Sequence, residues 1–105
     1  MRFYISGPIT GLPPDKAAHA FEDAEKVLVQ GGHSYINPER CLRGVELDHD
    51  SYLPINLAML RQCTAIVMLD GWRQSVGACM ELGMAMAMGK RVFYLISEEL
   101  LEWKY

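Results

Sequence analysis

In the stretch AIVMLDGWRQSVGACMELGMAMAMGKRVFYLI, residues 65–96, a run of strand length is followed by an apolar segment of helical length and a second β-prone run. The first run, residues 65–69, contains no polar side chain, which is typical of a strand in a parallel sheet covered on both faces. Residues 76–88 supply the helix and residues 92–96 the second strand. The stretch therefore predicts a strand–helix–strand unit with a right-handed crossover.

Earlier parts of the chain repeat this alternation of strand and helix. Residues 3–5 are a short β-prone run, and the Ser6-Gly7-Pro8 break after them can begin only a loop. A helix is predicted between Pro13-Pro14-Asp15 and Gly31-Gly32, because apolar residues recur there at steps of four, three and four. Those apolar positions are Ala17, Phe21, Ala24 and Leu28.

The middle and the end of the chain are less regular. A brief strand is predicted at residues 34–36, whereas residues 39–50 have no clean period and indicate a surface loop that could include a helical turn. Ser51 is expected to cap the next helix. Ser97 is expected to cap a last short helix that runs through Trp103.

Strands that alternate with helices at this spacing predict an α/β fold with a mostly parallel sheet, and the length suits one domain spanning residues 1–105. Ligands of such sheets bind beyond the carboxyl ends of the strands, where the strand order reverses. Two glycine-bearing loops, residues 6–11 and 70–77, follow strands and are therefore predicted to contact a ligand. The second loop leads into a helix N-terminus, whose free N–H groups favour an anion such as phosphate.

The composition excludes several classes of protein. Half of the residues are hydrophobic and the net charge is −3, which argues against a disordered chain and against a basic surface for polymeric nucleic acid. The apolar run at the N-terminus is too short for a signal peptide and no run approaches a membrane span, so we expect a cytoplasmic protein without a membrane partner. Cys41, Cys63 and Cys79 form no CxxC pair, so we expect neither a disulfide framework nor a metal site.

Glu81 is the one charged residue within the apolar segment 76–88. A helix that is apolar all round is usually buried, and burial raises the pKa of a carboxyl group. Such a carboxylate can be a nucleophile or a general acid or base. A structural role remains open, either at a dimer interface or in an ion pair with Arg73 or Arg91. The residues at helical spacing from Glu81 are small or apolar: Gly77, Ala78, Met84 and Ala85.

The block DGWRQSVGACMELGMAMAMGKRVFYL, together with YISGPITG near the start, resembles the nucleoside 2-deoxyribosyltransferase superfamily, including its nucleoside 5′-monophosphate N-glycosidase branch. The chain is most similar to a small subgroup of that superfamily that is common in phage and bacterial genomes. The resemblance runs through nearly the whole chain in the same order, and its S-x-G-x-x-x-E-L-G element is fairly specific. It implies a flavodoxin-like or Rossmann-like, doubly wound, mostly parallel sheet of about four to five strands with helices on both faces.

The resemblance also implies chemistry at the anomeric carbon of a nucleoside, without a cofactor. Glu81 occupies the position of the glutamate that attacks this carbon, and Tyr4 is similar to the tyrosine that orients it. Transferases of the superfamily tend to have an aspartate six residues before the glutamate, whereas the monophosphate hydrolases have a serine that helps to bind phosphate. This chain has Ser75, a suitable N-cap for the helix, with Gly77 close behind.

One position departs from the superfamily. An aspartate early in the helix before the central strand usually donates a proton to the departing base, and Asn56 stands at the matching place. Asparagine cannot donate a carboxylic proton. Three explanations remain open: Asp48, Asp50 or Asp70 takes the role, the leaving group needs little help, or the site binds without turnover.

Two residues of the second loop have alternative roles. Asp70 could contact ribose or base, or could merely begin the Asp70-Gly71 turn. Trp72 could stack on a nucleobase or pack at a subunit interface. The residues predicted to bind substrate are Ser6, Gly7, Pro8, Ile9, Thr10, Gly11, Asn56, Asp70, Gly71, Trp72, Ser75 and Gly77.

We therefore predict an enzyme that hydrolyses or exchanges the N-glycosidic bond of a small nucleoside or nucleoside 5′-monophosphate. An alternative is an inactive module that binds a nucleotide without cleaving it, and a weaker one is a structural or partner-binding protein. The superfamily also suggests a homodimer or a higher homo-oligomer, for which the apolar helix would provide a contact surface.

Overall fold

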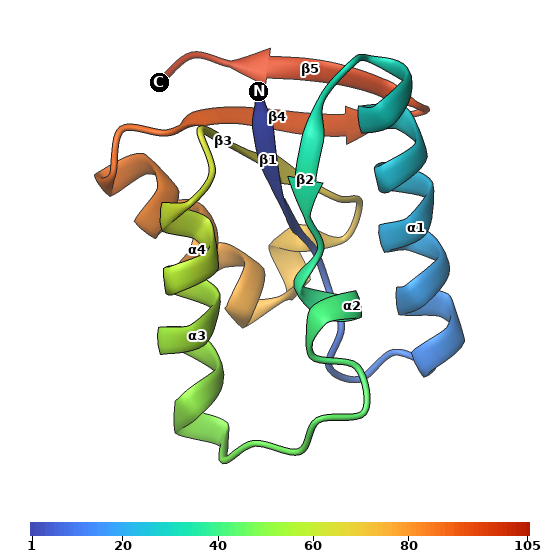
Figure 1. Ribbon diagram of the computed structural model, residues 1–105, viewed down its shortest axis with the longest axis vertical. Helices are drawn as coiled ribbons and strands as arrows, with labels where there is room; N and C mark the ends of the chain where they lie inside the picture. Colours follow the sequence, from blue (N-terminus) through green and yellow to red (C-terminus); the bar gives the residue numbers. More distant parts are fainter.

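The computed structural model describes residues 1–105 and has a five-stranded sheet at its centre, with strand order β2-β1-β3-β4-β5 (Figure 1). The first four strands in chain order are parallel, and only β5 runs antiparallel, beside β4. This arrangement confirms the predicted α/β fold with a mostly parallel sheet. The strands are β1 (Arg2–Ser6), β2 (Ser34–Ile36), β3 (Ala65–Met68), β4 (Arg91–Ile96) and β5 (Glu99–Trp103).

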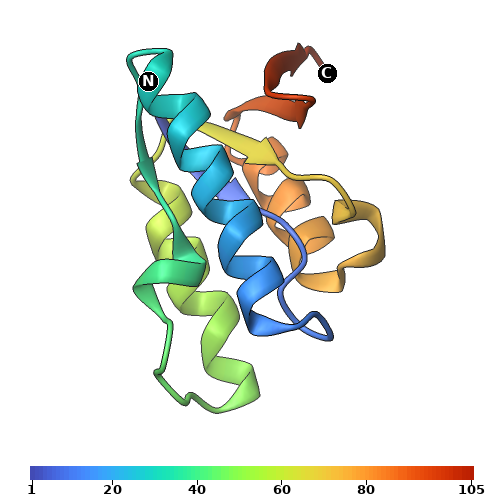
Figure 2. The same ribbon diagram turned by 90° about the vertical axis from the view of Figure 1, so that its right-hand side faces the viewer.

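Helices cover both faces of this sheet, as Figures 1 and 2 show. On one face α1 (Pro14–Gln30) buries Phe21 and Leu28 against the strands. On the other face α3 (His49–Arg61) and α4 (Val76–Ala87) form a second, separate core with the opposite sides of the same strands. Two single turns, α2 (Pro38–Cys41) and η1 (Trp72–Gln74), lie in the connections.

The pleat of β1 determines which of its side chains face α4. Because successive side chains of a strand point to opposite faces, Phe3 and Ile5 pack in the core on the α1 side. Tyr4 packs in the core that contains α4, and Ser6 shares its face. The strand thus presents two hydroxyl groups toward α4.

The prediction of a last helix from Ser97 to Trp103 is wrong, because these residues form a hairpin with β4. Ser97 and Glu98 both have positive φ, at 48° and 67°, as a tight two-residue hairpin turn requires. Leu100 packs against the α1-side core, as Leu95 does directly across the hairpin. Strand pairing and this contact outweigh the local tendency of the sequence to form a helix.

The segment predicted as a loop with room for a helical turn contains one such turn, α2, which is capped by Asn37. Two smaller differences concern the other helices. α3 begins at His49 after Asp48, two residues before the predicted cap Ser51. α4 is only half buried, contrary to the expectation for an apolar helix, since one side of it faces solvent. The large side chains on that exposed side are Val76, Met80, Met84 and Met88.

The other predicted element boundaries agree with the structure to within one or two residues. None of the helices is both long enough and apolar enough to cross a membrane.

Candidate active site

Glu81 lies on the inner side of α4, against β1. The hydroxyl group of Tyr4 donates a hydrogen bond to Glu81 Oε2 at 2.5 Å, and the hydroxyl group of Ser6 donates to Oε1 at 2.7 Å. The glutamate is 7% exposed, and both hydroxyl-bearing residues are buried. Two donors that are one pleat apart thus hold both carboxylate oxygens in place.

Burial raises the pKa of Glu81, and this effect exceeds the opposing effects of its hydrogen bonds from Tyr4 and Ser6 and of the nearby amide of Asn56. Burial also raises the pKa of Tyr4 far above its ordinary value, and the negative charge of Glu81 adds to this. Tyr4 therefore keeps its proton and acts as a hydrogen-bond donor. A desolvated carboxylate of this kind has the electronic character that a nucleophile or a base requires.

Neither arginine that could have paired with Glu81 does so. Arg91 forms two hydrogen bonds of 2.7 Å with Glu102, at the start of β4. Arg73 lies over the ring of Trp72, 5.3 Å from its centre. The partners of Glu81 are therefore uncharged groups.

Asn56 extends from α3 toward the same carboxyl group. The Asn56 amide lowers the pKa of Glu81 less than the hydroxyl groups of Tyr4 and Ser6 do. The other end of the amide, Oδ1, is buried and has no hydrogen-bond partner. The structure thus brings the predicted position next to Glu81, and a neutral amide occupies it.

The two predicted ligand loops meet where β1 and β3 end. A Cβ atom on Gly7 would lie 2.9 Å from Leu69 Cβ, and a Cβ atom on Gly71 would lie 3.3 Å from Pro8 Cγ. Gly71 also has a φ of 84°, which other residues rarely adopt. Glycine at both positions therefore allows the loops to pack closely, while the last part of the first loop, Ile9, Thr10 and Gly11, is exposed.

The N-terminus of α4 has the predicted cap. Ser75 Oγ accepts a hydrogen bond from the backbone N–H of Ala78 at 3.1 Å. No atom lies within 4 Å of the place where a Cβ atom of Gly77 would be, so the first turn is open on that side. Ser75 and Gly77 thus leave room for a ligand at the helix start.

The side chains of Trp72 and Asp70 line open grooves at the surface. The Trp72 ring packs beside Tyr94, with 5.8 Å between ring centres, in an open groove of about 820 Å³ that Trp103 also lines. Asp70 borders this groove and a second one of about 410 Å³ beside α1. Glu81 lines neither groove and forms no hydrogen bond with Asp70 or Trp72.

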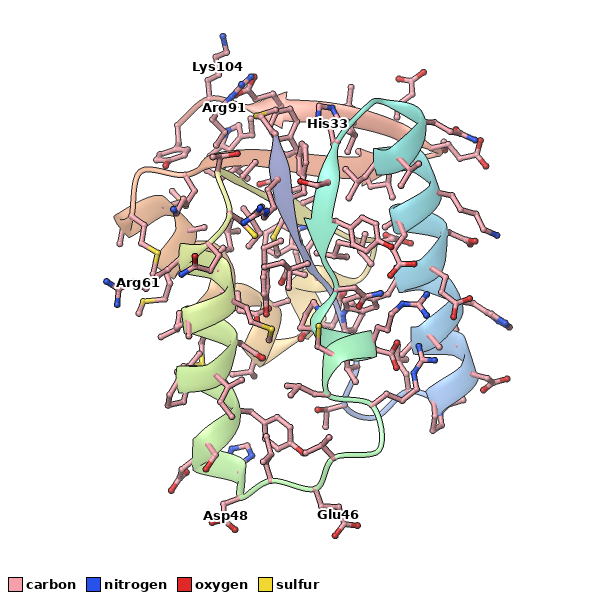
Figure 3. All side chains as sticks on the ribbon, in the orientation of Figure 1. His33, Glu46, Asp48, Arg61, Arg91 and Lys104 are labelled. Atoms are coloured by element: carbon pink, nitrogen blue, oxygen red, sulfur yellow. The ribbon has the colours of Figure 1, made fainter.

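Two further acidic residues were candidates for the proton donor. Asp48 and Asp50 are exposed at the start of α3 and make no hydrogen bond with Glu81. Figure 3 shows the side chain of Asp48 at the outer end of the loop before α3, directed away from the sheet. No group of three His, Cys, Asp or Glu side chains lies close enough together to hold a metal ion.

Sequence reasoning missed the contact between Ser6 and Glu81, because Ser6 was grouped with the loop after β1. The alternation of side chains along the strand could have revealed it, since residues two apart share a face. It also missed a second buried glutamate, Glu25 of α1. The carboxylate of Glu25 accepts hydrogen bonds from Asn37 at 2.7 Å and from two nitrogens of Arg40 at 2.8 and 3.0 Å.

Solved structures with this fold include two of 2-deoxyribosyltransferases and one of a CMP N-glycosidase. The enzyme from Bacillus psychrosaccharolyticus is 22% identical, with a TM-score of 0.67 over 90% of this chain and 71% of that one. The CMP N-glycosidase from Clostridium botulinum is 19% identical, with a TM-score of 0.63 over 90% and 70%. The Leishmania mexicana 2-deoxyribosyltransferase is 19% identical, with a TM-score of 0.65 over 99% and 79%.

These similarities confirm, for the fold, the predicted resemblance to the nucleoside 2-deoxyribosyltransferase superfamily. A comparison with curated protein sequences finds no match. The model of a family described as a domain of unknown function, DUF4406, matches residues 1–94. The chain therefore belongs to the DUF4406 family.

Proposed function

We propose that this protein cleaves or exchanges the N-glycosidic bond of a nucleoside or a nucleoside 5′-monophosphate, with Glu81 as the nucleophile. The observation that carries the proposal is the buried Glu81 carboxylate, held by the hydroxyl groups of Tyr4 and Ser6 and paired with no cation. The similarity in fold to a 2-deoxyribosyltransferase and to a CMP N-glycosidase supports the same class of reaction.

In this mechanism a Glu81 oxygen attacks the anomeric carbon as the bond to the base breaks, and the bonding electron pair leaves with the base. The resulting glycosyl ester is then resolved by water or by an acceptor base, as in retaining glycosidases. Tyr4 and Ser6 fix the carboxylate in one orientation, which lowers the entropic cost of the attack. No cofactor takes part.

The sugar and its phosphate are proposed to bind at the loop after β1 and at the start of α4. Backbone N–H groups at a helix N-terminus favour an anion, and α4 is long enough to have this property. Ser75 and Gly77 would contact the phosphate there, together with the glycine-bearing loop of residues 6–11. Asn56 would lie beside the base or the sugar, whereas Asp70 and Trp72 have no contact that supports their predicted roles.

We also propose a homodimer or a higher homo-oligomer, as a single-domain, cytoplasmic protein. The exposed apolar side of α4 supports association, because such a stripe on a surface helix is usually covered by a partner. Val76 is its most exposed side chain, at 77%. Sedimentation equilibrium of the wild type and of Met80→Lys would test this, and a monomer at micromolar concentration in both would contradict it.

The second candidate function is nucleotide binding without turnover, and Asn56 favours it because the site lacks a carboxylic acid beside the nucleophile. Calorimetry would then detect binding of a nucleotide that the protein does not consume.

The proposed activity can be tested with a panel of ribo- and deoxyribonucleosides and their 5′-monophosphates, with and without a second base. Chromatography would measure free or exchanged base. We expect release that depends on Glu81 and is lost in Glu81→Gln, whereas Glu46→Gln, which alters an exposed loop glutamate (Figure 3), serves as the matched control. Absence of product with every substrate, or activity that survives Glu81→Gln, would contradict the proposal.

A further inference from the structure

The site around Glu81 contains one carboxyl group. Retaining glycosidases place a second carboxyl group about 5–5.5 Å from the nucleophile, where it protonates the leaving group. The side chains that form hydrogen bonds with Glu81 are instead the uncharged hydroxyl groups of Tyr4 and Ser6, and no second carboxyl group is among its partners. The position on α3 that faces Glu81 is filled by the amide of Asn56.

The hydroxyl groups beside Glu81 cannot replace this acid. The proton of Tyr4 is already donated to Glu81 Oε2, and its raised pKa makes the phenol a poorer proton donor than tyrosine in water. Ser6 is occupied in the same way at Oε1, and an aliphatic hydroxyl is a still weaker acid. A neutral base would thus have to depart from this site without being protonated by the protein.

The charge around the site also disfavours an anionic leaving group. No lysine, arginine or histidine forms an ion pair with Glu81, so no side-chain cation in contact with the nucleophile would stabilise a departing phosphate. Instead the buried Oδ1 of Asn56 adds an unpaired partial negative charge near the carboxylate. These surroundings are complementary to a base that is positively charged before it leaves.

We propose that the preferred substrates of this site are N-glycosides of a quaternised, positively charged base, such as a pyridinium or an N7-alkylated purine. This inference rests on the proposed function and specifies its substrate class. A Glu81 oxygen forms a bond to the anomeric carbon while the carbon–nitrogen bond breaks. The electron pair of that bond returns to the ring nitrogen system and cancels its positive charge, so the base leaves neutral and needs no proton. Water then attacks the anomeric carbon, Glu81 leaves as a carboxylate, and one proton passes to solvent.

The test uses two substrates that differ by one methyl group and its positive charge, 7-methylguanosine 5′-monophosphate and guanosine 5′-monophosphate. Nicotinamide mononucleotide provides a pyridinium, and the corresponding nucleosides repeat the comparison without phosphate. Each rate is divided by the rate with Glu81→Gln, which removes the intrinsic lability of the charged substrates. Because a general acid typically contributes about 10²–10⁴-fold, we expect the enhancement to be at least about 100-fold larger for the charged substrates.

Asn56→Asp provides the complementary measurement, because it places a carboxyl group where the amide now faces Glu81. We expect the ratio between the two enhancements to fall at least about tenfold, through a gain on guanosine 5′-monophosphate. Equal enhancements in the wild type, or a preference for the neutral substrate, would overturn this inference and leave the proposed function standing. No cleavage of any substrate would overturn both. If Asn56→Asp does not fold, the wild-type comparison decides alone.

Discussion

Glu25 and Glu81 are almost equally buried, at 8% and 7% exposure, yet their surroundings differ in kind. Glu25 accepts two hydrogen bonds from the guanidinium of Arg40, which lowers the pKa of Glu25. Glu81 accepts hydrogen bonds from the neutral hydroxyl groups of Tyr4 and Ser6, and burial raises its pKa. Two differences therefore separate the carboxylates: Glu25 has a cationic partner, and Glu81 lies deeper among other atoms, so that desolvation dominates its pKa.

The presence or absence of a cationic partner indicates which buried glutamate is functional. A carboxylate with a bidentate arginine is electrostatically satisfied, and here it connects α1 with α2. A buried carboxylate without a cation retains a high affinity for a proton or for an electrophile, and such groups cluster at functional sites. On this ground Glu25 is a structural residue and Glu81 is the candidate nucleophile.

The largest effect should come from Glu81→Gln. We expect cleavage to fall more than about 1000-fold, since an amide cannot form the glycosyl ester. Folding should be nearly unaffected, because glutamine removes the cost of burying a charge and can still accept a hydrogen bond from Tyr4. Product release by chromatography and thermal unfolding would measure both. A large loss of stability would show that Glu81 resembles Glu25 after all.

Tyr4→Phe should reduce activity by a smaller factor. The lost hydrogen bond to a charged group corresponds to about 1.5–3 kcal/mol, or roughly 10- to 100-fold in kcat. Ser6→Ala removes the second donor and allows the two hydroxyl groups to be compared. The control is the KM of Tyr4→Phe, which should change little, because the Tyr4 hydroxyl donates to Glu81 and is not among the groups proposed to bind the substrate. A wild-type kcat in Tyr4→Phe would contradict its positioning role.

Glu25→Gln should affect stability and leave activity near that of the wild type. We expect a loss of about 1–2 kcal/mol in the free energy of unfolding, because the buried partner of Arg40 loses its charge. The loss stays in this range because the Arg40 side chain is half exposed and can be hydrated again. Urea unfolding would measure it. A loss of activity without a loss of stability would reverse the assignment of the two glutamates.

The smallest effect concerns the dependence of stability on pH, which should have opposite signs for the two residues. The pKa of Glu25 is lowered on folding, so its contribution is present above the unfolded pKa of about 4.3 and is lost as the pH falls through the folded value. The pKa of Glu81 is raised on folding, so its unfavourable contribution grows as the pH rises from about 4.3 through the folded value.

Urea unfolding of the wild type, Glu25→Gln and Glu81→Gln between about pH 3 and pH 8 would measure this difference. We expect Glu25→Gln to lose more stability relative to the wild type as the pH rises. Glu81→Gln should instead gain relative stability over the same change. Parallel curves for the two variants would show that their surroundings do not differ in the way described.

Local patterns in the sequence were sufficient for most of the fold. The apolar run of β3, the spacing along α1 and the Ser75 cap of α4 depend on residues close together in the chain, so a single sequence contains the signal. The unusual position of Glu81 within an apolar helix was equally visible. Glu81 and Tyr4 are 77 residues apart in the chain, and they meet because α4 packs on the parallel sheet that contains β1.

The features that depend on residues far apart in the chain could be seen only in the folded protein. Residues 99–103 became a strand because β4 offered an edge for pairing. The contact between Ser6 and Glu81 exists because alternate residues of β1 face α4. The ring of Trp72 packs beside Tyr94. The amino-acid sequence alone shows which side chains are capable of chemistry. Which of these side chains come into contact depends on long-range packing and strand pairing. Neither of these leaves a signature in short stretches of the chain.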